Sequence, residues 1–302
     1  MRQLLHRRIE TQLDRAAARF LGDPRLPKTE FSGPVGAQAL VPADSISWQV
    51  FKNPVTLFIG GVTAVILELA DPKVRTGVWE HSIFTTDPVL RLKRTGFAAM
   101  VTIYAARNTA EVLISKVNRI HQRVQGETPS GAVYDARDPE LLSWVQATAA
   151  FGFLQAYSTY AAPVSDQDQE RYYAESQPIA ELYGAMQAPA SLAAQGHYFD
   201  SRLNKLEPSK IVFDFLGIMA RAKIFPAPAH LGQAMLIRAA VDLVPPAIRE
   251  IVGLGAEYGL RGFEKPLISL MARRADRYIL RSSPAVRACR RLGLADDFLY
   301  LK

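Results

Sequence analysis

Apolar side chains recur along most of this chain at intervals of three and four residues, which is the period of an amphipathic α-helix. The clearest example runs from residue 108 to residue 126, where the apolar positions are Leu113, Ile114, Val117, Ile120 and Val124. No stretch alternates apolar and polar residues for long enough to predict a strand. The pattern therefore predicts an all-α protein, with about ten helices packed into a single multi-helix domain.

Several of the predicted helices begin with the same signal, an Asn or Asp followed by proline. The clearest pairs are Asn53-Pro54, Asp87-Pro88 and Asp138-Pro139. The Asn or Asp side chain accepts hydrogen bonds from the free backbone N–H groups of the first turn, and proline fits the first helical position. Another helix is predicted to begin at Asn108, with Glu111 completing a capping box, and to end at Gly126.

The most apolar of these segments covers residues 55–70. It is shorter than the roughly 20 residues that span a bilayer and it contains Glu68, so we predict a buried helix. Gly60 and Gly61 lie in its middle, where each glycine costs about 1 kcal/mol relative to alanine. Either the close approach of another helix or contact with a flat ligand would account for the pair.

The composition is that of a globular protein, with 302 residues of which 49% are hydrophobic. Residues 1–47 are predicted to form an N-terminal amphipathic helix, at 1–20, and an ordered loop, and residues 48–302 the helical domain. The single cysteine, Cys289, excludes an internal disulfide and a cysteine-based zinc site, and it fits a cytoplasmic protein. No signal peptide is predicted.

The formal net charge is +7, and the arginines are densest near the C-terminus. This group comprises Arg273, Arg274, Arg277, Arg281, Arg287, Arg290 and Arg291. It is typical of a solvated basic face, although an anionic partner, such as lipid head groups or a haem propionate, is an alternative. No nucleic-acid partner is expected. A peripheral membrane contact and a homo-oligomer both stay open.

One histidine stands out because it projects from an apolar helix face. His121 continues the spacing of Val117 and Ile120 on the helix predicted at residues 108–126. A lone histidine there is often an ordinary core residue, but a neutral imidazole in an apolar wall is also a good ligand for haem iron. The residues alone leave both interpretations open.

Six short motifs occur in a fixed order between residues 50 and 245. They lie at residues 67–72 (LELADP), 77–84 (GVWEHSIF), 87–95 (DPVLRLKRT), 121–126 (HQRVQG), 134–145 (YDARDPELLSWV) and 172–175 (YYAE). With these motifs the sequence resembles the MpaB/rubber-oxygenase family, a group of haem proteins that includes latex-clearing protein.

The resemblance implies a globin-like helical core around haem b. It implies that His121 is the proximal iron ligand and that Arg91, Arg94 and Thr95 lie on the distal side, where they contact bound oxygen or the propionates. It also implies an oxygenase that takes dioxygen and an apolar substrate, isoprenoid or lipid-like. His81 is a further candidate for the pocket, as a distal polar group or proton carrier.

The sequence departs from the family pattern at two positions. Asn118 stands where the family often has arginine, three residues before the ligand histidine, and Gln146 replaces a histidine after Trp144-Val145. The distal glutamate that serves rubber oxygenases as a base has no evident counterpart, and Glu80 and His81 are the nearest polar residues in sequence. Two alternatives to the oxygenase therefore stay open: a haem-binding sensor or carrier without turnover, and a haem-free helical protein that binds lipid or a partner.

Overall fold

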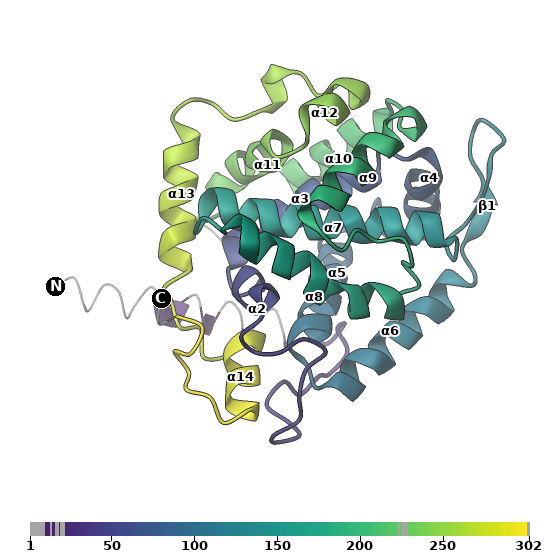
Figure 1. Ribbon diagram of the computed structural model, residues 1–302. Coiled ribbons are helices and arrows are strands. Elements are labelled where there is room, and N and C mark those ends of the chain that lie inside the picture. Colours follow the sequence, from purple (N-terminus) through teal and green to yellow (C-terminus); the bar gives the residue numbers. More distant parts are fainter. Residues whose placement is uncertain are drawn as a thin grey trace.

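The computed structural model describes residues 10–12, 14–15, 18, 22–222, 224 and 229–300, and it confirms a single all-α domain (Figure 1). The α-helices are α2 (Ile46–Phe51), α3 (Pro54–Glu68), α4 (Pro72–His81), α5 (Pro88–Tyr104), α6 (Arg107–His121), α7 (Pro139–Tyr160), α8 (Asp166–Leu182), α9 (Leu192–Arg202), α10 (Lys210–Arg221), α11 (Gln233–Asp242), α12 (Pro246–Val252), α13 (Glu264–Ala275) and α14 (Pro284–Arg291). Short 3-10 helices lie at Leu203–Lys205, Ala229–Gly232 and Ala256–Tyr258.

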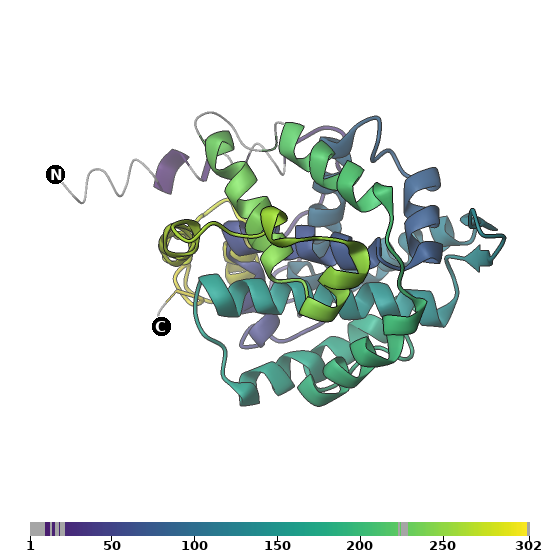
Figure 2. The same cartoon turned by 90° about the horizontal axis from the view of Figure 1, so that it is seen from above.

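The centre of the fold is the crossing of α3 and α7, which the other helices surround (Figures 1 and 2). At this crossing the two backbones touch through Gly60 and Gly152. A Cβ added to Gly60 would lie 2.7 Å from the carbonyl oxygen of Gly152, closer than real Cβ atoms approach. The close approach of another helix therefore accounts for Gly60. A Cβ added to Gly61 would meet nothing nearer than a Phe153 ring carbon at 3.8 Å, so helix packing does not account for that glycine.

The helix starts predicted from Asn-Pro and Asp-Pro pairs are confirmed. Asn53 accepts hydrogen bonds from the backbone N–H groups of Val55 and Thr56, at 3.1 and 3.3 Å. Asp87 and Asp138 cap α5 and α7 in the same way. Asn53 also donates from Nδ2 to the carbonyl of Ala272 at 2.9 Å, so the cap of α3 joins the central helix to α13.

The predicted boundaries of the helix that carries His121 are wrong at both ends. The helix α6 begins at Arg107, after Ala106, and the side chain of Asn108 does not cap it. It ends at His121, because the chain turns there into the antiparallel pair β1 (Gln125–Glu127) and β2 (Val133–Asp135), which the sequence pattern does not predict. Gly126 lies in β1, where a Cβ would come within 2.7 Å of the Tyr134 hydroxyl. The glycine allows this close approach rather than ending a helix.

Two further helices were not predicted: α2 begins within the last two residues of the expected loop, and α4 follows the stop at Asp71-Pro72. The predicted N-terminal helix at 1–20 lies largely outside the described residues. Within the described ranges no single helix has the length and apolar character needed to cross a membrane. Helices α3 and α4 meet that requirement only when taken together, across a bend of 113°.

Candidate functional site

The central helix leaves one stripe of residues partly accessible. Along α3 the residues Gly61, Val65 and Glu68 recur at steps of four and three and keep some exposed surface, whereas the neighbours Ile66 and Leu67 are buried completely. Residues at this spacing share one face of a helix. In the second half of α3, this stripe is therefore the part that the described side chains leave uncovered.

Glu68, the last residue of α3, ends this stripe in unusual electrostatic surroundings. Desolvation by the surrounding protein raises the pKa of its carboxyl from 4.5 to about 7, and the positive charge of Arg91 offsets part of that effect. An isolated carboxylate is costly in such surroundings because it loses its hydration. Glu68 is thus poised to exchange a proton near neutral pH, a property common to acids and bases in active sites.

Arg91 faces Glu68 from the first turn of α5. Desolvation lowers the pKa of its guanidinium, the Glu68 carboxylate acts in the opposite direction, and Arg94 adds a smaller lowering. The guanidinium also donates to the hydroxyl of Thr95, one turn further along the helix, and that hydroxyl donates to the Arg91 carbonyl at 3.0 Å. Arg91 is partly buried, whereas Arg94 and Thr95 are exposed. In the segment from Arg91 to Thr95, the Arg91 side chain is therefore directed toward the interior and is bound by the Thr95 hydroxyl, whereas the Arg94 side chain lies at the surface.

His121 completes the group from a third helix, as the last residue of α6. Desolvation lowers the pKa of its imidazole, and the positive charge of Arg91 lowers it further, so the ring is neutral at neutral pH. Its Nδ1 atom is buried without a hydrogen-bond partner among the described residues, and so is the Oδ1 atom of Asn118, one turn earlier. Asn118 is held by a 2.9 Å hydrogen bond from its Nδ2 to the carbonyl of Leu182. The Nδ1 atom of His121 is thus not held by a hydrogen bond within the described part of the chain.

His81 lies in different surroundings from these residues. It ends α4, is exposed, and its Nε2 atom is 3.1 Å from the hydroxyl of Tyr134. The same hydroxyl donates to the Glu80 carboxylate at 3.2 Å. The structure therefore groups His81 with Glu80 and the β1–β2 hairpin, while Arg91 interacts electrostatically with His121 and Glu68.

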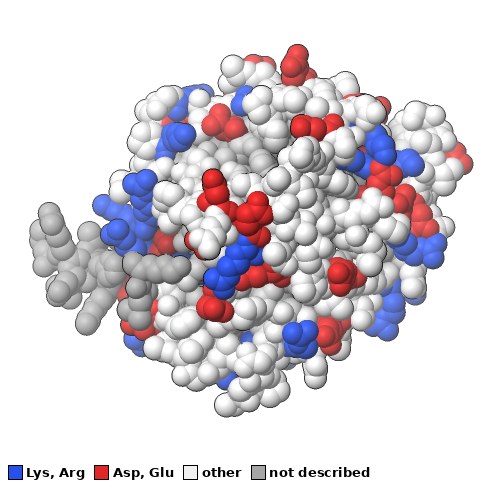
Figure 3. All heavy atoms as spheres, in the orientation of Figure 1, with Lys and Arg blue, Asp and Glu red and all other residues white. Residues whose placement is uncertain are grey.

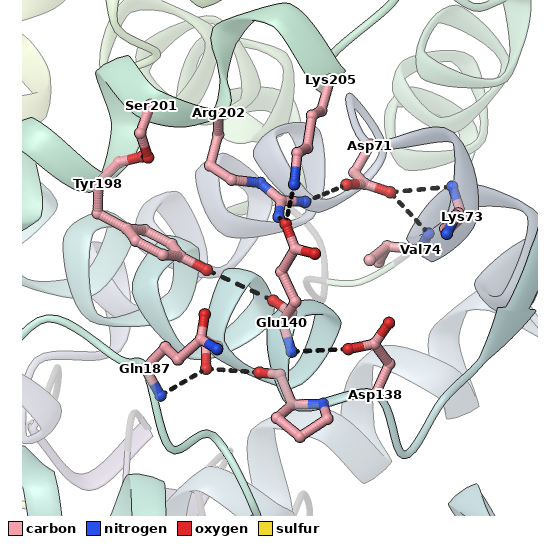
Figure 4. Close-up of polar contacts among 12 residues, drawn as sticks. Asp71, Lys73, Val74, Asp138, Glu140, Gln187, Tyr198, Ser201, Arg202 and Lys205 are labelled. Atoms are coloured by element: carbon pink, nitrogen blue, oxygen red, sulfur yellow. Dashed lines mark hydrogen bonds and ion pairs between the residues drawn. The ribbon is translucent and has the colours of Figure 1, made fainter.

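A network of ion pairs fixes the turn that follows Glu68 (Figure 4). Asp71 caps α4 by accepting from the backbone N–H groups of Lys73 and Val74, at 2.9 and 3.2 Å, and its other oxygen lies 2.5 Å from Nη2 of Arg202. Arg202 also pairs with Glu140 at the start of α7. Both Asp71 and Arg202 are almost fully buried. The network thereby ties the turn after α3 to α7 and α9.

One surface cleft lies elsewhere. It has a volume of about 600 Å³ and is lined mainly by the end of α7, the end of α11 and α12, including an ion pair between Asp242 and Arg249 at 3.6 Å. None of the predicted site residues lines it. This cleft is therefore separate from Glu68, Arg91 and His121.

These residues fit a haem group. His121 supplies a neutral imidazole whose ring has an unpaired buried nitrogen, and Arg91 and Arg94 are cations suited to propionates. Gly61, on the same helix as Glu68, leaves room on the face of α3, because a Cβ there would meet nothing nearer than Phe153 at 3.8 Å. The sequence analysis did not identify Glu68 as a site residue. The one feature of the sequence that could have indicated it is that Glu68 is the only acidic residue within the apolar segment 55–70.

One of three comparisons with known proteins finds a match. Neither a curated protein nor a solved structure matches the chain. Residues 48–269 match the family model described as ER-bound oxygenase mpaB/B'/Rubber oxygenase, catalytic domain. That range contains Glu68, Arg91 and His121, and it covers most of the chain. The protein therefore belongs to the mpaB/rubber oxygenase family, and its residues 48–269 are the catalytic domain of that family.

Proposed function

We propose that this protein is a haem b-dependent oxygenase that acts on an apolar, isoprenoid or lipid-like substrate, with His121 as the proximal iron ligand. The observation that carries the proposal is the convergence of Glu68, Arg91 and His121. They come from three separate helices, each is desolvated by the surrounding protein, and the charge of Arg91 acts on both Glu68 and His121. Family membership supports the oxygenase class.

The roles follow from the chemistry of each side chain. When bound, haem supplies the iron centre at which dioxygen is held and activated. His121 presents a neutral imidazole for the iron, and Arg91 and Arg94 supply positive charge for propionates or for an oxygen atom that gains negative charge. Thr95 holds the Arg91 guanidinium. Glu68, with a pKa of about 7, accepts a proton from the substrate and returns it later in the reaction.

The ligand assignment is tested by absorption spectra after expression with added haem. We expect the wild type to show a Soret band and His121→Ala to lose most of its haem. His197→Ala, which removes an exposed histidine on α9, is the matched control and should keep the spectrum of the wild type. An unchanged spectrum in His121→Ala would refute the assignment, and loss of the band in His81→Ala instead would move the ligand to that residue.

Turnover is tested separately, by product formation from polyprenyl and fatty substrates under oxygen. Replacing Glu68 with glutamine should preserve haem binding and reduce turnover by about 10²- to 10⁴-fold, the usual contribution of a general base. The exposed Glu127→Gln is the control. A haem-loaded protein that is inert on a broad panel of apolar substrates would favour a haem sensor or carrier over an oxygenase.

A further inference from the structure

Helix α13 carries large apolar side chains on its outer surface. Phe263, just before the helix, is 69% exposed, and Leu267 and Leu270 are 44% and 47% exposed. They are separated by steps of four and three residues, so they share one face. A single exposed apolar residue is ordinary, but three in line on one helix form a surface that favours burial.

Arginines extend the same stripe. Arg274 continues the spacing near the end of α13, Arg273 lies beside it, and Arg277 follows in the turn after the helix; all three are exposed. We call the six residues Phe263, Leu267, Leu270, Arg273, Arg274 and Arg277 the α13 face. In the described part of the chain no carboxylate lies within 4.0 Å of these arginines. Figure 3 shows blue basic atoms gathered along the left edge of the molecule, where Figure 1 places α13.

The acids of this segment point inward. The Glu264 side chain is only 3% exposed and pairs with Arg238, and Asp276 lies 3.2 Å from Nζ of Lys52. The α13 face therefore presents only positive charge. Other arginines of the C-terminal basic group do not form the solvated basic face that the sequence predicts. Arg291 is buried and donates to backbone carbonyls, and Arg290 forms an ion pair with Asp296.

We propose that the α13 face docks on an anionic lipid surface. Apolar side chains enter the boundary between head groups and acyl chains, while arginines bind the phosphate groups beside them. A second copy of the chain fits poorly, because parallel pairing would oppose arginine to arginine and antiparallel pairing would oppose arginine to leucine. This inference goes beyond the proposed oxygenase and does not depend on it.

The test is sedimentation of the full chain with vesicles of phosphatidylcholine, alone or mixed with phosphatidylglycerol. The wild type should bind the anionic vesicles more tightly, and added salt should weaken that binding. Each arginine near an anionic surface contributes about a factor of five, so removing three should weaken binding by about 100-fold. The variant is Arg273→Gln, Arg274→Gln and Arg277→Gln; its control, with the same change of charge, is Lys28→Gln, Lys116→Gln and Lys210→Gln.

The apolar half of the face is tested in parallel. Combining Phe263→Ser, Leu267→Ser and Leu270→Ser should also reduce vesicle binding, whereas Val35→Ser, Val112→Ser and Met186→Ser, at exposed apolar positions elsewhere, should not. Replacing the three arginines by lysine should retain binding. The proposal is overturned if wild type shows no preference for anionic vesicles or if the arginine variant binds like its lysine-site control. It is also overturned if the serine changes abolish self-association in sedimentation velocity and leave vesicle binding intact.

Discussion

Replacing Glu68 with glutamine should change how the stability of this protein depends on pH. Desolvation by the surrounding protein raises the pKa of Glu68 from 4.5 to about 7, so the folded state holds this proton more tightly than the unfolded state does. Between pH 4.5 and pH 7 the unfolded chain therefore binds fewer protons at this group than the folded protein, and the free energy of unfolding falls as pH rises. Above pH 7 both states are ionised and the effect is constant.

The magnitude follows from the same pKa. At 1.36 kcal/mol per pH unit, a rise from 4.5 to about 7 makes ionised Glu68 cost about 3 kcal/mol of folding free energy. Glutamine resembles the protonated acid and does not titrate. The difference in free energy of unfolding, Glu68→Gln minus wild type, should therefore be about 3 kcal/mol more positive at pH 8 than at pH 4.5.

Urea denaturation of both proteins at a series of pH values measures this difference. Glu127→Gln, at an exposed position on the hairpin, is the control and should show a nearly constant difference from wild type. A difference for Glu68→Gln that is equally constant between pH 4.5 and pH 8 would refute the argument, because it would mean that the carboxyl ionises as easily in the folded protein as in water.

Two further predictions concern the glycines of α3 and the charge of Arg91. Gly60→Ala should destabilise the protein by roughly 3 kcal/mol in urea denaturation, because the new Cβ would collide with the Gly152 carbonyl. Gly61→Ala should be neutral or should stabilise the protein by up to about 1 kcal/mol, because its Cβ would meet no close atom. Equal effects of the two substitutions would contradict the packing described at this crossing. Arg91→Gln should raise the pKa of Glu68 above 7, because it removes the positive charge that lowers it, so the fall in stability should extend to higher pH; an unchanged pH range would mean that the two groups do not interact.

The sequence predicted those features that depend on neighbouring residues. Asn53, Asp87 and Asp138 cap their helices through atoms two or three positions along the chain, so their role is visible in any stretch of four residues. Glu68 could not be assigned in this way, because its raised pKa depends on how densely the folded protein surrounds it. Nor could the sequence alone show that Arg91 of α5 faces it.

The region around His121 shows the same limit. Its helix was predicted from periodicity, but the end of that helix depends on the β1–β2 hairpin and on Tyr134, which lies beside Gly126. The pairing of His81 with Tyr134 is likewise a contact across 53 positions of sequence. The candidate site is thus a tertiary feature assembled from locally predictable helices.

The contact between Gly60 and Gly152 has a consequence for how this fold can diversify. No side chain separates the two backbones, so α3 and α7 are packed tightly against each other and a sliding movement of one along the other would bring their atoms into collision. Glu68 lies about two turns beyond Gly60 on the same helix, so the tight packing at the crossing also limits the movement of Glu68. Arg91 and His121 belong to α5 and α6, outside the crossing, so a shift of these outer helices would change the shape of the candidate site and leave the crossing unchanged.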